Sequence, residues 1–152
     1  MSMNKAESRP AILVHGYLAM PHLLLPMKWA LAQHDVRAHL ARLSPLCIGD
    51  VRILAKQLGA NVDRVRRETG SEKVDLVGVS LGGFAALHYL TELGGSENVG
   101  RFVAVASPFH GTWFALFGVA ALGAVSKGAW QCLPNSGLVK QMIQGGAPQI
   151  PS

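Results

Sequence analysis

Short apolar runs alternate with longer amphipathic stretches along most of this chain. Runs of four to six residues, dominated by valine, leucine, isoleucine and alanine, are typical of strands that are buried on both faces of a parallel sheet. Such strands are predicted at 11–14, 36–40, 74–79 and 101–106.

The segments between these strands have helical character. In 51–65, apolar residues recur at three- and four-residue spacing, as on one face of a helix. Asp50 is placed to cap the start of this helix, and Gly70 is placed to end it. Further helices are predicted over 23–33 and from the third strand to the glycine pair 94–95. Strands alternating with helices predict an α/β fold with a mainly parallel sheet and right-handed crossovers.

The composition is that of a single apolar globular domain, which we take as residues 1–152. Hydrophobic residues make up 49% of the chain and charged residues 15%, which excludes a disordered protein. The net charge of +5 is scattered, and its densest cluster is Arg64, Arg66 and Arg67. These arginines fall on a predicted helix, where we expect a solvated face and no nucleic-acid surface.

Cys47 and Cys132 do not form a disulfide framework; free thiols are expected, and a single pairing stays open. No metal or cofactor is expected. The start of the chain is polar and has no apolar leader, so a cytoplasmic location is the default, with secretion left open. The apolar segment 112–125 spans 14 residues, too short for a transmembrane helix, which needs about 20. This segment is expected to form either a cap over a binding site or a core helix on the sheet.

The most informative motif is Gly78-Val79-Ser80-Leu81-Gly82. It lies between a predicted strand and a predicted helix, the arrangement of a nucleophile elbow that exposes a serine oxygen above the sheet. Side chains at 78 or 82 would crowd the tight turn. The motif therefore predicts that Ser80 is a nucleophile.

The first strand ends in His15-Gly16-Tyr17. An acyl-transfer serine needs hydrogen-bond donors for the oxyanion, one from the residue after the serine and one from a loop after an earlier strand. The backbone amides of Leu81 and Tyr17 are therefore predicted to form the oxyanion hole. Gly16 allows the loop to approach, and His15 is expected to support the loop, with a role as base the alternative.

Together with Ala106-Ser107-Pro108-Phe109-His110-Gly111-Thr112, these two motifs resemble the bacterial lipase/esterase branch of the α/β-hydrolase superfamily. The resemblance runs from about residue 10 to the end of the chain. It implies a partial α/β-hydrolase fold with a sheet of about four strands in the order 2-1-3-4, flanked by helices. It also implies hydrolysis of carboxylic esters or acylglycerols through an acyl-Ser80 intermediate. In that strand order, the loops that carry Tyr17 and Ser80 meet where open α/β sheets bind ligands.

The chain departs from the superfamily in its acid and base. There the triad runs Ser, Asp or Glu, then His, whereas Glu92 and Glu97 are the only acids after Ser80 and come too early. We therefore expect this chain to correspond to the N-terminal half to two-thirds of a hydrolase. His110 is the candidate base, because its strand is predicted to end beside Ser80; a pocket-lining role is the alternative.

Two further functions stay open. A hydrolase fragment that ends after four strands would expose a sheet edge, and exposed edges favour self-association. The chain would then be a truncated, catalytically impaired hydrolase that only binds lipids or associates with itself. An acyltransferase would use the same Ser80 with another acceptor.

Overall fold

A computed structural model describes residues 9–123, 126–146, 148 and 150. Its centre is one parallel sheet, and its four strands are β1 (Ala11–Val14), β2 (Ala38–Leu40), β3 (Val74–Val79) and β4 (Val99–Val105). The strands lie in the order β2-β1-β3-β4. The predicted fold class, the parallel pairing and the strand order are confirmed.

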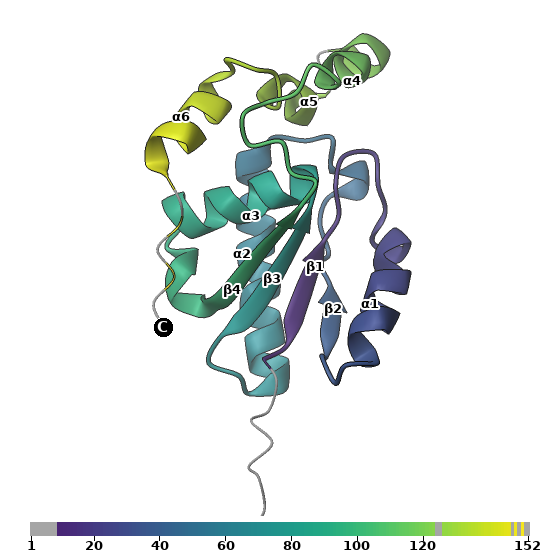
Figure 1. Ribbon diagram of the computed structural model, residues 1–152, viewed down its shortest axis with the longest axis vertical. Coiled ribbons are helices and arrows are strands. Elements are labelled where there is room, and N and C mark those ends of the chain that lie inside the picture. The colour runs from purple at the N-terminus through teal and green to yellow at the C-terminus, as the bar shows by residue number, and fades with distance from the viewer. Residues whose placement is uncertain (1–8, 124–125, 147, 149, 151–152) are drawn as a thin grey trace, which may run out of the picture.

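Helices cover both faces of the sheet and its carboxyl end (Figure 1). The α-helices of the described part are α1 (Leu25–Ala32), α2 (Val51–Thr69), α3 (Leu81–Glu92), α4 (Ala115–Leu122), α5 (Lys127–Gln131) and α6 (Gly137–Gly145). Short 3-10 turns occur at Pro21–Leu24, Pro45–Cys47 and Gly95–Asn98. α4 and α5 lie beyond the ends of the strand arrows, so they cover the edge of the sheet at which ligands bind in α/β folds (Figure 1).

β1 is buried on both faces because side chains alternate along a strand. Ile12 and Val14 belong to a fully buried cluster with residues of α2 and α3. Ala11 and Leu13 point to the other face and pack against α1. The central strand is therefore apolar at every position, as the sequence pattern predicts.

The boundaries of three elements differ from the prediction. β2 begins at Ala38 and not at 36, because the chain is still turning at Asp35, whose φ is 60°. The predicted helix over 23–33 begins as the 3-10 turn Pro21–Leu24 and becomes α-helical only at Leu25, next to a second proline. β4 starts two residues earlier than predicted, at Val99.

The ends of α2 confirm the prediction. The Asp50 carboxylate accepts a hydrogen bond from the Arg52 backbone amide at 2.9 Å, and Gly70 follows the helix with a left-handed φ of 69°. The side chains of Arg52 and Gln131 also donate to this carboxylate. The hydrogen bonds to this carboxylate, above all the one from the Arg52 side chain, hold the pKa of Asp50 well below its usual range. Asp50 therefore caps a helix and links it to α5.

The apolar segment after β4 forms a cap and not a core helix. Of the eight residues of α4, only Gly118 is buried, and Phe117 is 73% exposed. Trp113 and Phe114, just before the helix, are also exposed. The expectation of a core helix is wrong, because this segment lies past the end of the sheet, where no further layer of the described structure covers it (Figure 1).

Both cysteines are free and buried, and burial raises the pKa of each thiol to about 12. None of the described helices combines the length and the hydropathy that a bilayer crossing requires. Within the same residues, histidine, cysteine and carboxylate side chains form no group of three or more that could hold a metal ion.

One edge of the sheet is open. In the described chain, β4 pairs with β3 along one side and with no strand along the other. On the face away from α3, Val103 is 51% exposed and Val105 is 38% exposed. The open edge therefore presents both unpaired backbone groups and apolar side chains to solvent.

Candidate active site

Ser80 stands at a sharp bend between β3 and α3. Its φ of 52° and ψ of −121° lie outside the regions that residues with a side chain normally occupy. Such a conformation costs on the order of 1–3 kcal/mol and persists only where neighbouring structure enforces it. Here the Ser80 amide donates to the Val105 carbonyl at 2.9 Å, and the Ser80 carbonyl accepts from Gly83 at 3.0 Å. Both bonds hold the serine at the tip of the bend.

Glycines make this bend possible. A Cβ added to Gly78 would lie 2.6 Å from the Cα of Gly83, well inside contact distance. A Cβ added to Gly82 would collide with the carbonyl oxygens of Val14 and His15. The predicted crowding of the turn is confirmed for Gly78, whereas Gly82 is required for a different reason: it lets α3 pack directly against the end of β1.

The loop after β1 reaches the serine. A Cβ added to Gly16 would lie 2.9 Å from the Cβ of Ser80 and 3.0 Å from the Val79 carbonyl oxygen. Tyr17 follows at once, and Leu81 is the first residue of α3, where backbone amides lack helical partners. Neither the Tyr17 amide nor the Leu81 amide donates a hydrogen bond to another described residue. Two amides without a described partner therefore lie next to the serine in the chain or in the loop that reaches it.

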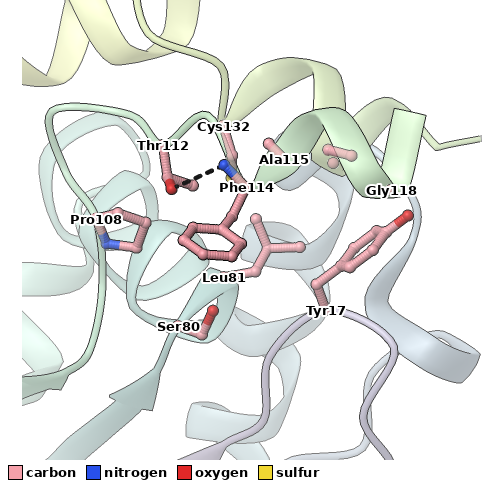
Figure 2. A pocket seen from close by; sticks show the side chains of 11 residues that line it. Tyr17, Ser80, Leu81, Pro108, Thr112, Phe114, Ala115, Gly118 and Cys132 are labelled. Atoms are coloured by element: carbon pink, nitrogen blue, oxygen red, sulfur yellow. Dashed lines mark hydrogen bonds between the residues drawn. The ribbon is translucent and has the colours of Figure 1, made fainter. Parts of the chain in front are cut away.

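Ser80 opens into a cavity of about 150 Å³. The cavity is lined by Tyr17, Ser80, Leu81, Pro108, Thr112, Phe114, Ala115, Gly118, Gly128, Ala129 and Cys132. Figure 2 shows the Ser80 hydroxyl directed into this space, with the Phe114 ring over it and Tyr17 across from it. The Phe114 amide donates to the Thr112 hydroxyl at 3.2 Å, and the Thr112 amide donates to the Cys132 carbonyl at 2.8 Å. The segment with Thr112 and Phe114, which covers Ser80, is thus hydrogen-bonded to the residue that follows α5.

His15 is buried at the start of the loop after β1 and does not line the cavity. It is 1% exposed, and its Nδ1 lies 3.3 Å from the Sγ of Cys47 and 3.3 Å from the Gly16 carbonyl oxygen. Burial lowers its pKa, so the neutral ring is favoured. Next to Cys47, the Leu46 carbonyl accepts from the Leu18 amide at 2.7 Å. The placement of His15 is that of a support for the loop, and Cys47 is a second support that the sequence does not reveal.

His110 is not placed next to Ser80. It is exposed and lines a different cavity of about 320 Å³, together with Leu87, Phe102, Phe109, Met142, Ile143, Gly146 and Pro148. Within the described residues, no hydrogen bond joins it to Ser80. The loop after β4 turns away towards α6 before it reaches the cap. The role of His110 as a base stays a prediction, and this placement does not support it.

The cavity contains no ionisable acid or base other than Tyr17 and the Cys132 thiol, counted over the described lining residues. His88 lies on α3 and is buried, and burial lowers its pKa. Asp50 is occupied by its helix cap. Among the described residues, the site therefore combines the Ser80 hydroxyl with two backbone amides that have no described partner, and no histidine–carboxylate pair lines the cavity.

The sequence assigns no role to 126–132, yet this segment forms one wall of the site. Gly128, Ala129 and Cys132 line the cavity. A Cβ on Gly128 would come within 3.0 Å of the Cδ2 of Leu81, so the small residue lets α5 pack against the elbow. The pair of small residues at 128–129 is the signal in the sequence for this close approach.

No protein-family model matches this sequence. Three of the similar solved structures are enzymes that act on esters or lipids by name. The mature lipase BlEst2 of Bacillus licheniformis is 20% identical, with a TM-score of 0.78 over 92% of this chain and 60% of that one. Lipase B of Aspergillus fumigatus is 19% identical, with a TM-score of 0.75 over 93% of this chain and 35% of that one. The metagenomic carboxyl esterase MGS0156 is 15% identical, with a TM-score of 0.70 over 97% of this chain and 48% of that one.

These similarities show that the chain has the fold of the α/β hydrolases. The chain spans 60% of the length of the first of these proteins and less than half of the other two. At such low identity the likeness concerns the fold, and a function has to be argued from the site itself.

Proposed function

We propose that the protein is a serine ester hydrolase of the lipase/esterase type that works through an acyl-Ser80 intermediate. The observation that carries the proposal is the strained backbone of Ser80 at a largely apolar cavity, next to Leu81 and to the loop with Tyr17, whose amides donate to no other described residue. The names of the similar structures, which are lipases and an esterase, support the same class of reaction.

In the proposed reaction the Ser80 Oγ attacks the carbonyl carbon of an ester and forms a tetrahedral intermediate. The amides of Tyr17 and Leu81 stabilise its oxyanion, and losing one such donor typically costs about 2.7–4 kcal/mol of transition-state stabilisation. The C–O bond to the alcohol then breaks, and the proton from the serine leaves with the alcohol. Water hydrolyses the acyl-enzyme and restores the serine.

The absence of a histidine or carboxylate from the described lining of the cavity shapes the expected substrate. Esters whose leaving group departs without protonation, such as p-nitrophenyl esters, should react best. In serine triads, binding and the oxyanion hole alone still give about 10³–10⁴-fold catalysis over water. We therefore expect slow but measurable turnover of activated esters with an apolar acyl group.

A serine-reactive fluorophosphonate tests this function directly. It should attach to Ser80 at one equivalent, as intact and peptide mass spectrometry would show. Ser80→Ala should abolish labelling, because the oxygen that reacts is removed, and should lower p-nitrophenyl ester turnover to the level that binding and the oxyanion hole alone provide. Ser71→Ala, which changes a serine between α2 and β3, is the control and should label like the wild type. Full labelling or turnover in Ser80→Ala would exclude the serine mechanism.

The open edge of β4 favours a second candidate, self-association of the chain without catalysis. We propose a second copy as the partner, because the edge presents the same unpaired backbone groups and apolar side chains in both copies. Size-exclusion chromatography with light scattering should then show a dimer that dissociates in Val103→Lys, where a charge is placed on the exposed face. A monomeric wild type at high concentration would rule this association out.

A further inference from the structure

Tyr17 joins the proposed oxyanion loop to the cap. Its backbone follows Gly16 at the end of β1, beside Ser80. Its hydroxyl lies 2.5 Å from the Oγ of Ser126, a residue 109 positions later in the chain. Its ring packs against α4, because a Cβ on Gly118 would lie 2.8 Å from the Tyr17 hydroxyl oxygen and 2.9 Å from its Cε1. The Tyr17 side chain thus contacts both helices of the cap, α4 through Gly118 and the start of α5 through Ser126.

The buried Ser126 hydroxyl has the Tyr17 hydroxyl as its hydrogen-bond partner. Ser126 is 0% exposed, so an unpaired hydroxyl there would be unfavourable. It also stands at the N-cap position of α5, where a serine side chain usually accepts a hydrogen bond from the helix backbone. In this helix the side chain makes no such cap. The Ser126 hydroxyl therefore bonds to the Tyr17 hydroxyl and does not cap α5.

α5 contacts the second proposed donor as well. Gly128 of this helix packs on the Leu81 side chain, so closely that a Cβ there would require the Leu81 side chain to shift. The same glycine lies near the Gly49 carbonyl oxygen, next to the start of α2. α5 therefore touches Tyr17 through Ser126 and Leu81 through Gly128, and it sets how far apart these two residues lie.

We propose that Ser126 is a positioning residue for ester hydrolysis. Through the Tyr17 hydroxyl, it holds the Tyr17 backbone amide at the correct place and angle towards the oxyanion on Ser80. The cap and the oxyanion hole are thereby coupled. Both donor amides are in place only when α5 packs against Tyr17 and Leu81. This inference rests on the proposed function, because it assigns the amide to an oxyanion.

The coupling predicts a specific kinetic signature. An oxyanion donor acts on charge that develops in the transition state, so its displacement lowers kcat and leaves KM nearly unchanged. Complete loss of a donor lowers kcat about 10²–10³-fold. A displaced amide retains part of its effect, so we expect kcat for a p-nitrophenyl ester to fall about 10- to 100-fold in Ser126→Ala and in Tyr17→Phe.

The two substitutions remove the same hydrogen bond, so the double variant should be no slower than the slower single variant. Ser126→Thr keeps the hydroxyl and should restore most of kcat. Thr69→Val is the matched structural control: its hydroxyl donates to the Val65 carbonyl at 2.7 Å within the last turn of α2, with no link to Tyr17 or α5. It should lower thermal stability while kcat stays at the wild-type value.

Hydrogen exchange provides a readout that does not depend on activity. Loop 15–20 should exchange its amides faster in both Ser126→Ala and Tyr17→Phe than in Thr69→Val. The inference is overturned if kcat is unchanged in Ser126→Ala, if the two effects are additive, or if loop exchange is unaffected. If the wild type neither turns over esters nor labels at Ser80 while loop exchange responds as expected, the proposed function fails and the mechanical coupling stands.

Discussion

Phe84→Ala should lower the free energy of unfolding by about 3–5 kcal/mol, the range for removing a buried phenylalanine side chain. Phe84 lies on α3, four residues after Ser80, and is 0% exposed. Its ring lies 5.5 Å from the ring of Phe109, centroid to centroid, so it connects the elbow helix to the loop after β4. Domains of this kind are typically stable by only about 5–15 kcal/mol, so this loss is a large share of the total.

Urea denaturation, followed by circular dichroism, measures this effect. Phe117→Ala is the matched control, because it removes the same side chain from α4, where the ring is 73% exposed. Substitutions at exposed sites usually change stability by less than about 0.5 kcal/mol. Equal losses in the two variants would show that Phe117 is as buried as Phe84, which would contradict the placement of the cap.

Gly82→Ala should inactivate the site and destabilise the fold together. Helix propensity alone favours alanine over glycine in a helix by about 0.5–1 kcal/mol. At this position, however, the new Cβ would collide with the carbonyl oxygens of Val14 and His15. Backbone at the end of β1 must move, and overpacking of this kind typically costs about 1–3 kcal/mol. We therefore expect a net loss of stability, opposite in sign to the propensity.

The same displacement should affect the chemistry, because the residues pushed aside lead directly into the proposed oxyanion loop. The rate constant for fluorophosphonate labelling of Ser80 should fall at least about 100-fold, comparable to the loss of one oxyanion donor. Gly137→Ala is the control, since no atom lies within 4 Å of the place where its Cβ would stand. A Gly82→Ala variant that labels at the wild-type rate would show that β1 and the elbow are not in close contact.

The fold places the site at the carboxyl ends of two adjacent strands, β1 and β3. Ser80 ends β3, and the loop with Tyr17 follows β1, its neighbour in the sheet. The crossover order makes these two strands central, so their carboxyl ends open a crevice between loops that diverge. α4 and α5 lie beyond the carboxyl ends of the strands (Figure 1), and Ala115, Gly118, Gly128 and Ala129 of these helices line the cavity.

The sequence by itself determined the features that depend on near neighbours in the chain. The strands at 11–14 and 74–79, the cap at Asp50 and the left-handed Gly70 follow from local hydrophobic spacing and from backbone conformations that few residues adopt. The elbow at Ser80 belongs to this group, since strand, glycines and helix are contiguous. The strand order was expected only through the resemblance to hydrolases, because local patterns do not say which strands pair.

Only the tertiary structure decided how distant segments meet. The apolar composition of 112–125 suits a core helix and a cap equally, and the exposure of α4 and of the residues just before it became clear only from their place beyond the sheet; residues 124 and 125 lie outside the described part. His110 lies in a separate cavity because the direction of a loop after its strand has no local signal. The contacts of Tyr17 with Ser126 and of Asp50 with Gln131 join residues 109 and 81 positions apart. Such pairs depend on the packing of whole elements, and no periodicity along the chain encodes them.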